Sequence, residues 1–152
     1  MTEVQCRSCR SISGEERISP GPTIAEGNYW VVEHAYPCAL MGWLVLVLKR
    51  HAAALHELTG AEFAEMATLL EKITKLLSKA LDCEKEYVMC LAEAEGFQHV
   101  HFHVVPRPKG IVEELKGPRI FAMLKVSLDE AVPPGEVKAL CERLKQSYSL
   151  NL

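Results

Sequence analysis

Three histidines alternate with apolar residues in the run His99-Val100-His101-Phe102-His103. Valine and phenylalanine favour β-strands, in which successive side chains point to opposite faces of the sheet. The run therefore predicts a strand with His99, His101 and His103 on one face and its apolar side chains on the other. Imidazole rings that are buried in a fold need hydrogen-bond partners or a metal ion. Strict alternation of three imidazoles thus indicates a chemical site, more than a polar strand face that happens to carry histidine.

Two kinds of chemistry suit three imidazoles on one face. Neutral imidazole is the side chain that most often binds metal ions in proteins. Its charge changes near pH ~6.5 when it is unperturbed, so it also serves as a nucleophile or as a general acid or base. The spacing of the three histidines leaves both chemistries open.

A second group of metal-binding side chains comes from outside this run. Cys6 and Cys9 form a C-x-x-C pair, and two such thiolates can hold one ion from a tight turn. Structural zinc usually has four tetrahedral sulfur and nitrogen ligands, so His51 and His99 are the candidates to complete a site with the two cysteines. A redox dithiol and two unrelated surface cysteines are the alternatives. The pair precedes every predicted strand–helix unit, which argues against the redox interpretation.

The composition is typical of a globular domain, and we expect residues 1–152 to form a single one. Hydrophobic residues make up 49% of the chain and charged residues 24%. The formal net charge is −3 and no basic stripe is present, so a nucleic-acid polymer is not an expected partner. No apolar run approaches the roughly 20 residues that cross a bilayer, so no membrane partner is expected either.

The N-terminus has no basic segment followed by an apolar one, unlike a signal peptide. We therefore expect a cytoplasmic location. In that compartment the six cysteines are expected to be reduced thiols or metal ligands, not a disulfide framework.

Strands and helices are expected on both sides of the histidine run. Thr59 and Glu62 have the form of a capping box and precede an apolar stripe with helical spacing, whose charged residues, Glu62 and Glu65 among them, are expected to face solvent. The remaining expected elements are strands at 29–33, 43–48 and 86–92, a helix at 136–148, a strand or short helix at 121–126, and a loop at 1–28. Together they predict an α+β domain.

The run from His99 to Val105 resembles the His-φ-His-φ-His-φ-φ signature of the histidine triad family of nucleotide hydrolases and transferases. Lys49-Arg50-His51, followed by a helix, is also similar to the segment after that family's first long hairpin. The resemblance covers the core at 28–107. Residues 1–28 would be a zinc-tethered N-terminal loop, and residues 108–152 a C-terminal extension with a helix.

The resemblance implies a fold and a reaction. The fold would be a five-stranded antiparallel sheet with flanking helices, in a homodimer. The reaction would be attack on the α-phosphate of a nucleotide or nucleotide conjugate, giving a nucleotidyl–histidine intermediate. His101, the middle histidine, would be the nucleophile. His103 would hydrogen-bond to the other nitrogen of His101 or to the phosphate.

The resemblance also bears on the metal. Zinc-bearing relatives, including the galactose-1-phosphate uridylyltransferases, use a C-x-x-C pair, a histidine after the central strand and the first triad histidine. Cys6, Cys9, His51 and His99 match that pattern one by one. Four protein ligands leave no open position for water, so the zinc would be structural.

Four further residues are candidates for substrate binding. Gln98 and Arg107 flank the histidine run, where they could meet phosphate oxygens; solvated charge is the alternative for Arg107. Glu33 or Asn28 could hold the ribose hydroxyls, a role for which relatives commonly use an acidic residue before the central strand. The spacing after Glu33 does not match that pattern, and Gln98 directly abuts His99 where relatives place a glutamine further upstream.

Three functions remain open from the sequence. The first is a histidine triad nucleotide hydrolase or nucleotidyltransferase. The second is transfer of the nucleotidyl group to a sugar phosphate or to inorganic phosphate instead of water. The third is a nucleotide-binding or zinc-dependent interaction module with little turnover.

Overall fold

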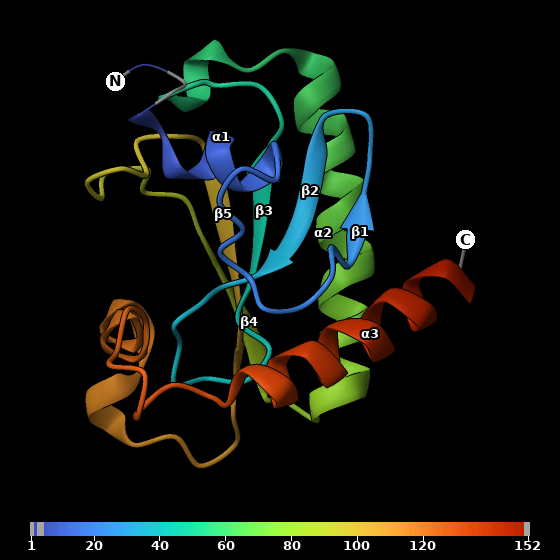
Figure 1. Cartoon of the computed structure of the whole chain (residues 1–152). Helices are drawn as coiled ribbons and strands as arrows, with labels where there is room; N and C mark the ends of the chain where they lie inside the picture. The colour runs from blue at the N-terminus through green and yellow to red at the C-terminus, as the bar shows by residue number, and fades with distance from the viewer. Residues whose placement is uncertain (1, 3–4, 151–152) are drawn as a thin grey trace.

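One five-stranded sheet forms the centre of the protein, with the order β1-β2-β3-β5-β4 and antiparallel pairing throughout (Figure 1). The computed structural model describes residues 2 and 5–150. The strands are β1 (Ala25–Glu26), β2 (Trp30–His34), β3 (Leu44–Leu48), β4 (Lys85–Met89) and β5 (His101–Arg107). The helices are α1 (Arg7–Ile12), α2 (Gly60–Leu81) and α3 (Pro134–Leu150), with 3₁₀ helices η2 (Leu55–Glu57), η3 (Glu113–Leu115) and η4 (Gly117–Met123). This arrangement confirms the predicted α+β fold.

The strands β3 and β5 lie side by side in the middle of the sheet and position the histidines. β3 is a continuous apolar run, as expected for a strand that is covered on both faces. Val47 lies opposite His101 and Val45 lies opposite His103. Because side chains alternate along each strand, these two valines and two histidines share one face of the sheet.

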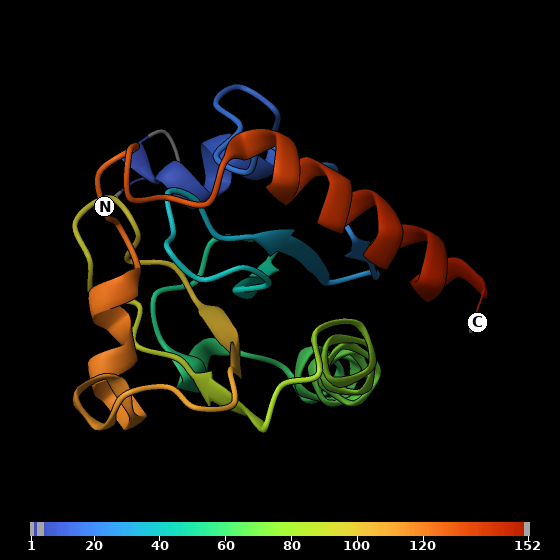
Figure 2. The same cartoon turned by 90° about the horizontal axis from the view of Figure 1, so that it is seen from below.

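The opposite face carries the main hydrophobic core. Leu46 of β3 and Phe102 of β5 pack there with Ile73 and Leu77 of α2, and α3 contributes Val137 to the same cluster. The two views together show α1 over the histidine face and α2 over the core face (Figures 1 and 2). The sheet thus separates the main apolar core from the face that carries His101 and His103, where Trp43 and Val105 belong to a second, smaller hydrophobic cluster. Among the helices of residues 5–150, none is long and apolar enough to cross a membrane.

The helix α2 begins at the predicted cap residue, Thr59. The Thr59 hydroxyl accepts a hydrogen bond from the Glu62 N–H, and the Glu62 carboxylate accepts one from the Thr59 N–H at 2.7 Å. The expectation that Glu62 faces solvent is wrong, because Arg50 donates to both of its carboxylate oxygens at 2.6 and 2.9 Å and its side chain is only 3% exposed. Hydrogen bonding from Arg50 lowers the pKa of Glu62 to about 2. This buried contact ties the start of α2 to the segment that carries His51.

The prediction of a loop at 1–28 is wrong in two places. Arg7–Ile12 form α1, and Ala25–Glu26 form the edge strand β1 beside β2. Both elements are too short to carry an apolar repeat. They form because of contacts with segments that are distant in sequence, which no local pattern reveals.

The undecided segment at 121–126 is helical in its first part, since η4 ends at Met123. Leu124 then forms an isolated bridge with Cys38, and the Lys125 N–H donates to the carbonyl of Pro37 at 3.0 Å. These contacts bring part of the C-terminal extension back to the connection between β2 and β3.

Candidate functional site

His101 and His103 lie next to each other on β5, with ring centroids 4.8 Å apart. His99 lies in a bend before the strand, so the prediction that all three histidines belong to one strand is wrong for His99. Its ring is engaged elsewhere: Nδ1 faces Cys6 and Cys9, and Nε2 bonds to the Leu48 carbonyl. The triad is therefore divided: His101 and His103 form a pair on β5, and the ring of His99 faces the two cysteines.

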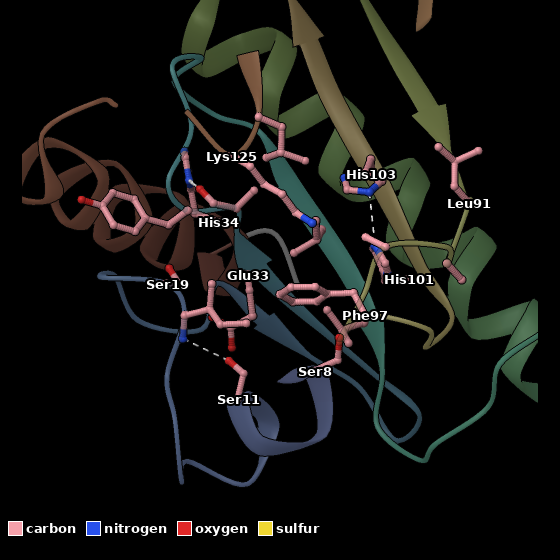
Figure 3. Close-up of a pocket in the computed structure, with 18 of the residues that line it drawn as sticks. Ser8, Ser11, Ser19, Glu33, His34, Leu91, Phe97, His101, His103 and Lys125 are labelled. Carbon is pink, nitrogen blue, oxygen red and sulfur yellow. Dashed lines mark hydrogen bonds between the residues drawn. The ribbon is translucent and has the colours of Figure 1, made fainter. Parts of the chain in front are cut away.

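A chain of hydrogen bonds determines which nitrogens of the pair carry protons. The indole Nε1–H of Trp43 donates to His103 Nδ1 at 3.0 Å, so the proton of neutral His103 is on Nε2. That nitrogen lies 3.1 Å from Nε2 of His101 (Figure 3). Nδ1 of His101 lies 2.6 Å from the carbonyl oxygen of His99, a contact that requires a proton on Nδ1. His101 Nε2 is therefore unprotonated and accepts the His103 N–H.

Burial keeps both rings neutral. Desolvation lowers the pKa of His101 and lowers the pKa of His103 to about 3, and the positive charge of Lys125 contributes to both shifts. A neutral imidazole with one bare nitrogen and the other held by an acceptor is the form that attacks an electrophile. The unprotonated nitrogen of His101 is Nε2, which His103 contacts. The other nitrogen, Nδ1, bonds to the His99 carbonyl and not to His103.

The two histidines open onto a cavity of about 400 Å³ (Figure 3). Ile12 and Ile18 line it from the N-terminal segment, and Val45 and Val47 line it from β3. Cavities of this size that combine apolar walls with a few polar groups are typical of small-molecule sites. The arrangement suits a ligand with an apolar ring and a polar reacting group.

Among the four predicted substrate-binding residues, Glu33 alone lines the cavity. Its carboxylate accepts hydrogen bonds from Thr23 Oγ1 at 2.6 Å and from Arg17 at 2.9 and 3.2 Å. A hydroxyl group of a ligand would therefore meet a carboxylate that is already neutralised by a cation.

The other three predicted substrate-binding residues do not line the cavity. Arg107 is buried at the end of β5, where its guanidinium lies 2.8 Å from Glu84. Asn28 is in the turn between β1 and β2, where its backbone N–H donates to Glu65 at 2.7 Å. Gln98 is exposed beside His99. Glu65 is partly exposed, and its carboxylate accepts backbone hydrogen bonds from that turn.

Two residues outside every motif of the sequence act on the histidines: Trp43 by a hydrogen bond and Lys125 by its charge. Trp43 reads as an apolar core residue, and its polar indole N–H is invisible in a hydropathy pattern. Lys125 belongs to the segment 121–126, for which the sequence pattern allowed either a strand or a short helix. Both join the site through pairings between distant segments, so no local signal could have identified them.

Trp43→Phe should lower kcat/KM by about tenfold or more, because a buried acceptor on His103 loses its donor. The histidine would then lose its preference for a proton on Nε2, which ¹⁵N spectra of the imidazoles detect directly. Trp30→Phe is the matched control, since the Trp30 indole donates to the Glu62 carbonyl in the core. An equal loss of activity and an unchanged His103 tautomer in the two variants would contradict the positioning role of Trp43.

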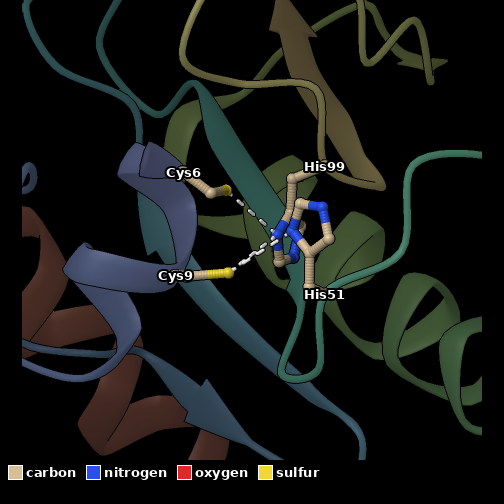
Figure 4. Close-up of side chains that lie close together, drawn as sticks. All are labelled: Cys6, Cys9, His51 and His99. Carbon is tan, nitrogen blue, oxygen red and sulfur yellow. Dashed lines mark hydrogen bonds between the residues drawn. The ribbon is translucent and has the colours of Figure 1, made fainter. Parts of the chain in front are cut away.

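The second chemical group lies where α1 meets the ends of β3 and β5 (Figure 4). One donor atom from each of Cys6, Cys9, His51 and His99 lies within 4.8 Å of all the others, and the four residues could hold a metal ion. The structure thus brings together all four predicted ligands, which come from three separate parts of the chain.

Three of the distances between donor atoms match a tetrahedral zinc ion. The thiol of Cys9 lies 3.5 Å from His51 Nδ1 and 3.4 Å from His99 Nδ1, and the thiol of Cys6 lies 3.4 Å from His99 Nδ1. Zinc bonds of about 2.3 Å to sulfur and 2.0 Å to nitrogen, at tetrahedral angles, place the two atoms about 3.5 Å apart. His99 Nε2 donates to the Leu48 carbonyl at 2.7 Å, which leaves Nδ1 free to bind metal.

Comparison with known proteins agrees with this geometry. Residues 24–110, more than half of the chain, match the sequence profile of the HIT domain, named for the histidine triad. The chain belongs to the HIT domain family. The family assignment covers β1 to β5 and the histidine pair on β5, and it confirms the resemblance drawn from the sequence.

Relatives of this HIT protein include an enzyme. Adenosine 5'-monophosphoramidase hnt1 of Schizosaccharomyces pombe is 34% identical over 70 residues, which are 44% of this chain and 50% of the relative. The chain therefore spans about half the length of that curated protein. The match makes this HIT protein a distant homologue of a nucleotide hydrolase.

Two solved structures share the fold over nearly the whole chain. A Zn-bound histidine triad family protein from Mycobacterium smegmatis has a TM-score of 0.70 and 18% identity, and covers 99% of this chain and 100% of its own. A hypothetical histidine triad nucleotide-binding protein from Sulfolobus tokodaii has a TM-score of 0.70 and 19% identity, and covers 97% and 93%. These likenesses confirm the fold.

Proposed function

We propose that this HIT protein is a nucleotidyl hydrolase or transferase that acts at the α-phosphate of a nucleotide conjugate through a nucleotidyl–His101 intermediate. The observation that carries the proposal is the bare Nε2 of His101, held in place beside a cavity by bonds to His99 and His103. The phosphoramidase relative supports an adenosine 5'-monophosphate group joined through nitrogen as one substrate.

In the first step the lone pair of His101 Nε2 attacks phosphorus. The bond from phosphorus to the leaving group breaks, and the leaving group takes the bonding electrons; a nitrogen leaving group takes a proton from solvent and departs as the neutral amine. His101 Nε2 then no longer accepts the His103 N–H, which becomes available to donate to a phosphoryl oxygen. The positive charge that develops on His101 is stabilised by the Nδ1–H bond to the His99 carbonyl.

In the second step water attacks phosphorus and the bond to His101 Nε2 breaks, so that its electron pair returns to the ring. The nucleoside monophosphate leaves, and the attacking water gives its proton to solvent, which balances the proton taken up in the first step. An alcohol or phosphate acceptor in place of water would make the same site a transferase.

Zinc bound to Cys6, Cys9, His51 and His99 would supply structural support, because four protein ligands leave no open position. His99 belongs to both sites: its ring is in the donor set and its carbonyl oxygen holds His101. The donor set would thereby orient the nucleophile without taking part in the reaction.

We also propose a homodimer, as the resemblance implies. Val88 on the edge strand β4 is 43% exposed and Leu91 just beyond it is 59% exposed, and a partner chain would cover such residues.

Intact-protein mass spectrometry tests the intermediate. Brief mixing with adenosine 5'-phosphoramidate, quenched without acid, should add one adenylyl group to the protein. His101→Ala should show no adduct, and His56→Ala, which replaces an exposed histidine on η2, should show the wild-type adduct. An adduct that survives in His101→Ala would contradict the assignment of the nucleophile. Tight binding of AMP without turnover or adduct would favour a binding module.

A further inference from the structure

Lys125 places a positive charge in the cavity. Its side chain points from the C-terminal extension toward His101 and His103 (Figure 3). Among the described residues that line the cavity, it is the sole lysine or arginine. Its charge acts on both histidines, whose pKa values it helps to lower.

The backbone holds Lys125 in this position. Its φ of 56° is in the left-handed region, which a residue with a side chain adopts at a cost of about 1 kcal/mol or more. The Lys125 N–H donates to the Pro37 carbonyl at 3.0 Å, and Leu124 bridges to Cys38. The extension is therefore attached to the connection between β2 and β3 at Leu124 and Lys125 themselves.

The amine has an aromatic contact but no carboxylate partner among the described residues. Its Nζ lies 5.0 Å from the centre of the Phe97 ring. The two acidic residues that line the cavity leave it unpaired, since Glu33 is bound by Arg17 and Glu93 makes no ion pair with Lys125. A cation held over an aromatic ring in a cavity, without a counter-ion from the protein, is suited to an anionic ligand.

We propose that Lys125 binds the anionic leaving group of the substrate and so selects nucleoside phosphoanhydrides over conjugates whose leaving group is uncharged. This inference rests on the proposed function. The His103 N–H donates to the α-phosphate during attack. The charge that Lys125 binds is therefore that of the leaving group, which follows the α-phosphate in the substrate. When the P–O bond of an anhydride breaks, its electron pair stays on the leaving oxygen, and Lys125 stabilises that negative charge without a proton transfer.

Two substrates with the same adenylyl group test the proposal: ADP, which releases phosphate, and adenosine 5'-phosphoramidate, which releases ammonia. In Lys125→Gln the ratio of kcat/KM for ADP to that for the phosphoramidate should fall about tenfold or more, the effect of losing a hydrogen bond to a charged group. Lys125→Arg should retain most of the ratio. Lys138→Gln on α3, which removes the same charge from an exposed position, should leave the ratio at the wild-type value.

Equal losses for ADP and for the phosphoramidate in Lys125→Gln would overturn the proposal, because Lys125 would then act on the shared α-phosphate or on the fold. Calorimetry with AMP and with α,β-methylene-ADP gives a readout that does not need turnover. The preference for α,β-methylene-ADP over AMP should shrink about tenfold in Lys125→Gln. A wild-type protein that hydrolyses neither substrate would refute the proposed function, while this binding ratio would still decide the role of Lys125.

Discussion

His101→Ala should lower kcat by more than about 10⁴-fold, because the variant has no nucleophile to form the intermediate. The loss should appear for every substrate that the wild-type protein turns over. His101 is partly exposed at the cavity, and its ring bonds only to His99 and His103 among the described residues, so the free energy of unfolding should change by no more than about 1 kcal/mol. Steady-state kinetics and urea unfolding measure the two effects on the same protein.

His56→Ala is the control that shows whether replacing a histidine outside the site also lowers kcat. His56 is exposed on η2 and should be neutral for activity and for stability, as expected for an ordinary surface residue. His34 also belongs to neither the histidine pair nor the donor set, but it lines the cavity, is 1% exposed and accepts the Gly42 N–H at 2.9 Å, so it is less suitable as a control. Turnover by His101→Ala within tenfold of wild type would refute the mechanism.

Cys6→Ser should weaken zinc binding by about 100-fold or more, since loss of even an outer partner of a metal ligand costs 10- to 100-fold. The free energy of unfolding should fall by several kcal/mol, because metal binding at such a site is coupled to folding. Turnover should fall as well, since His99 would no longer be held from both sides while its carbonyl orients His101. Metal analysis, thermal unfolding and kinetics measure these three effects.

Cys83→Ser is the matched control for Cys6→Ser. Cys83 is a partly buried thiol outside the donor set, near the start of β4, and bonds to Glu86. It should keep one equivalent of zinc and wild-type turnover. Cobalt exchanged into the wild-type protein should show the absorption of a tetrahedral thiolate complex, and Cys6→Ser should lose that spectrum. Full zinc occupancy and an unchanged melting temperature in Cys6→Ser would contradict the metal assignment.

The effects of Cys6→Ser and His101→Ala should not add in kcat. Both act on the position of one attacking nitrogen, and residues that act as a unit are strongly non-additive. The double variant should therefore be about as inactive as His101→Ala alone.

Local patterns in the chain were sufficient for the α+β class and for the types of chemistry, whereas the five-stranded antiparallel sheet was expected from the resemblance to the histidine triad family. Continuous apolar residues predict β3, the alternating run predicts β5, and the capping box at Thr59 predicts the start of α2. Each of these signals is local, because period and capping depend on neighbours within a few residues. For the same reason, the identities and spacing of Cys6, Cys9, His51 and His99 were enough to propose a metal site before any geometry was known.

Tertiary structure alone decided how these residues work together. The chain does not reveal that His99 leaves the strand to join two cysteines, or that its carbonyl holds His101. Nor does it reveal that Trp43 sets the tautomer of His103, or that Lys125 reaches the cavity. Apart from the bond between the His99 carbonyl and His101, which are two residues apart, these contacts join distant segments of the chain. They depend on strand register and on the path of the C-terminal extension. A bond between distant segments produces no periodic pattern in the sequence. The residue types therefore indicate the kind of chemistry, and the fold determines the role of each histidine nitrogen.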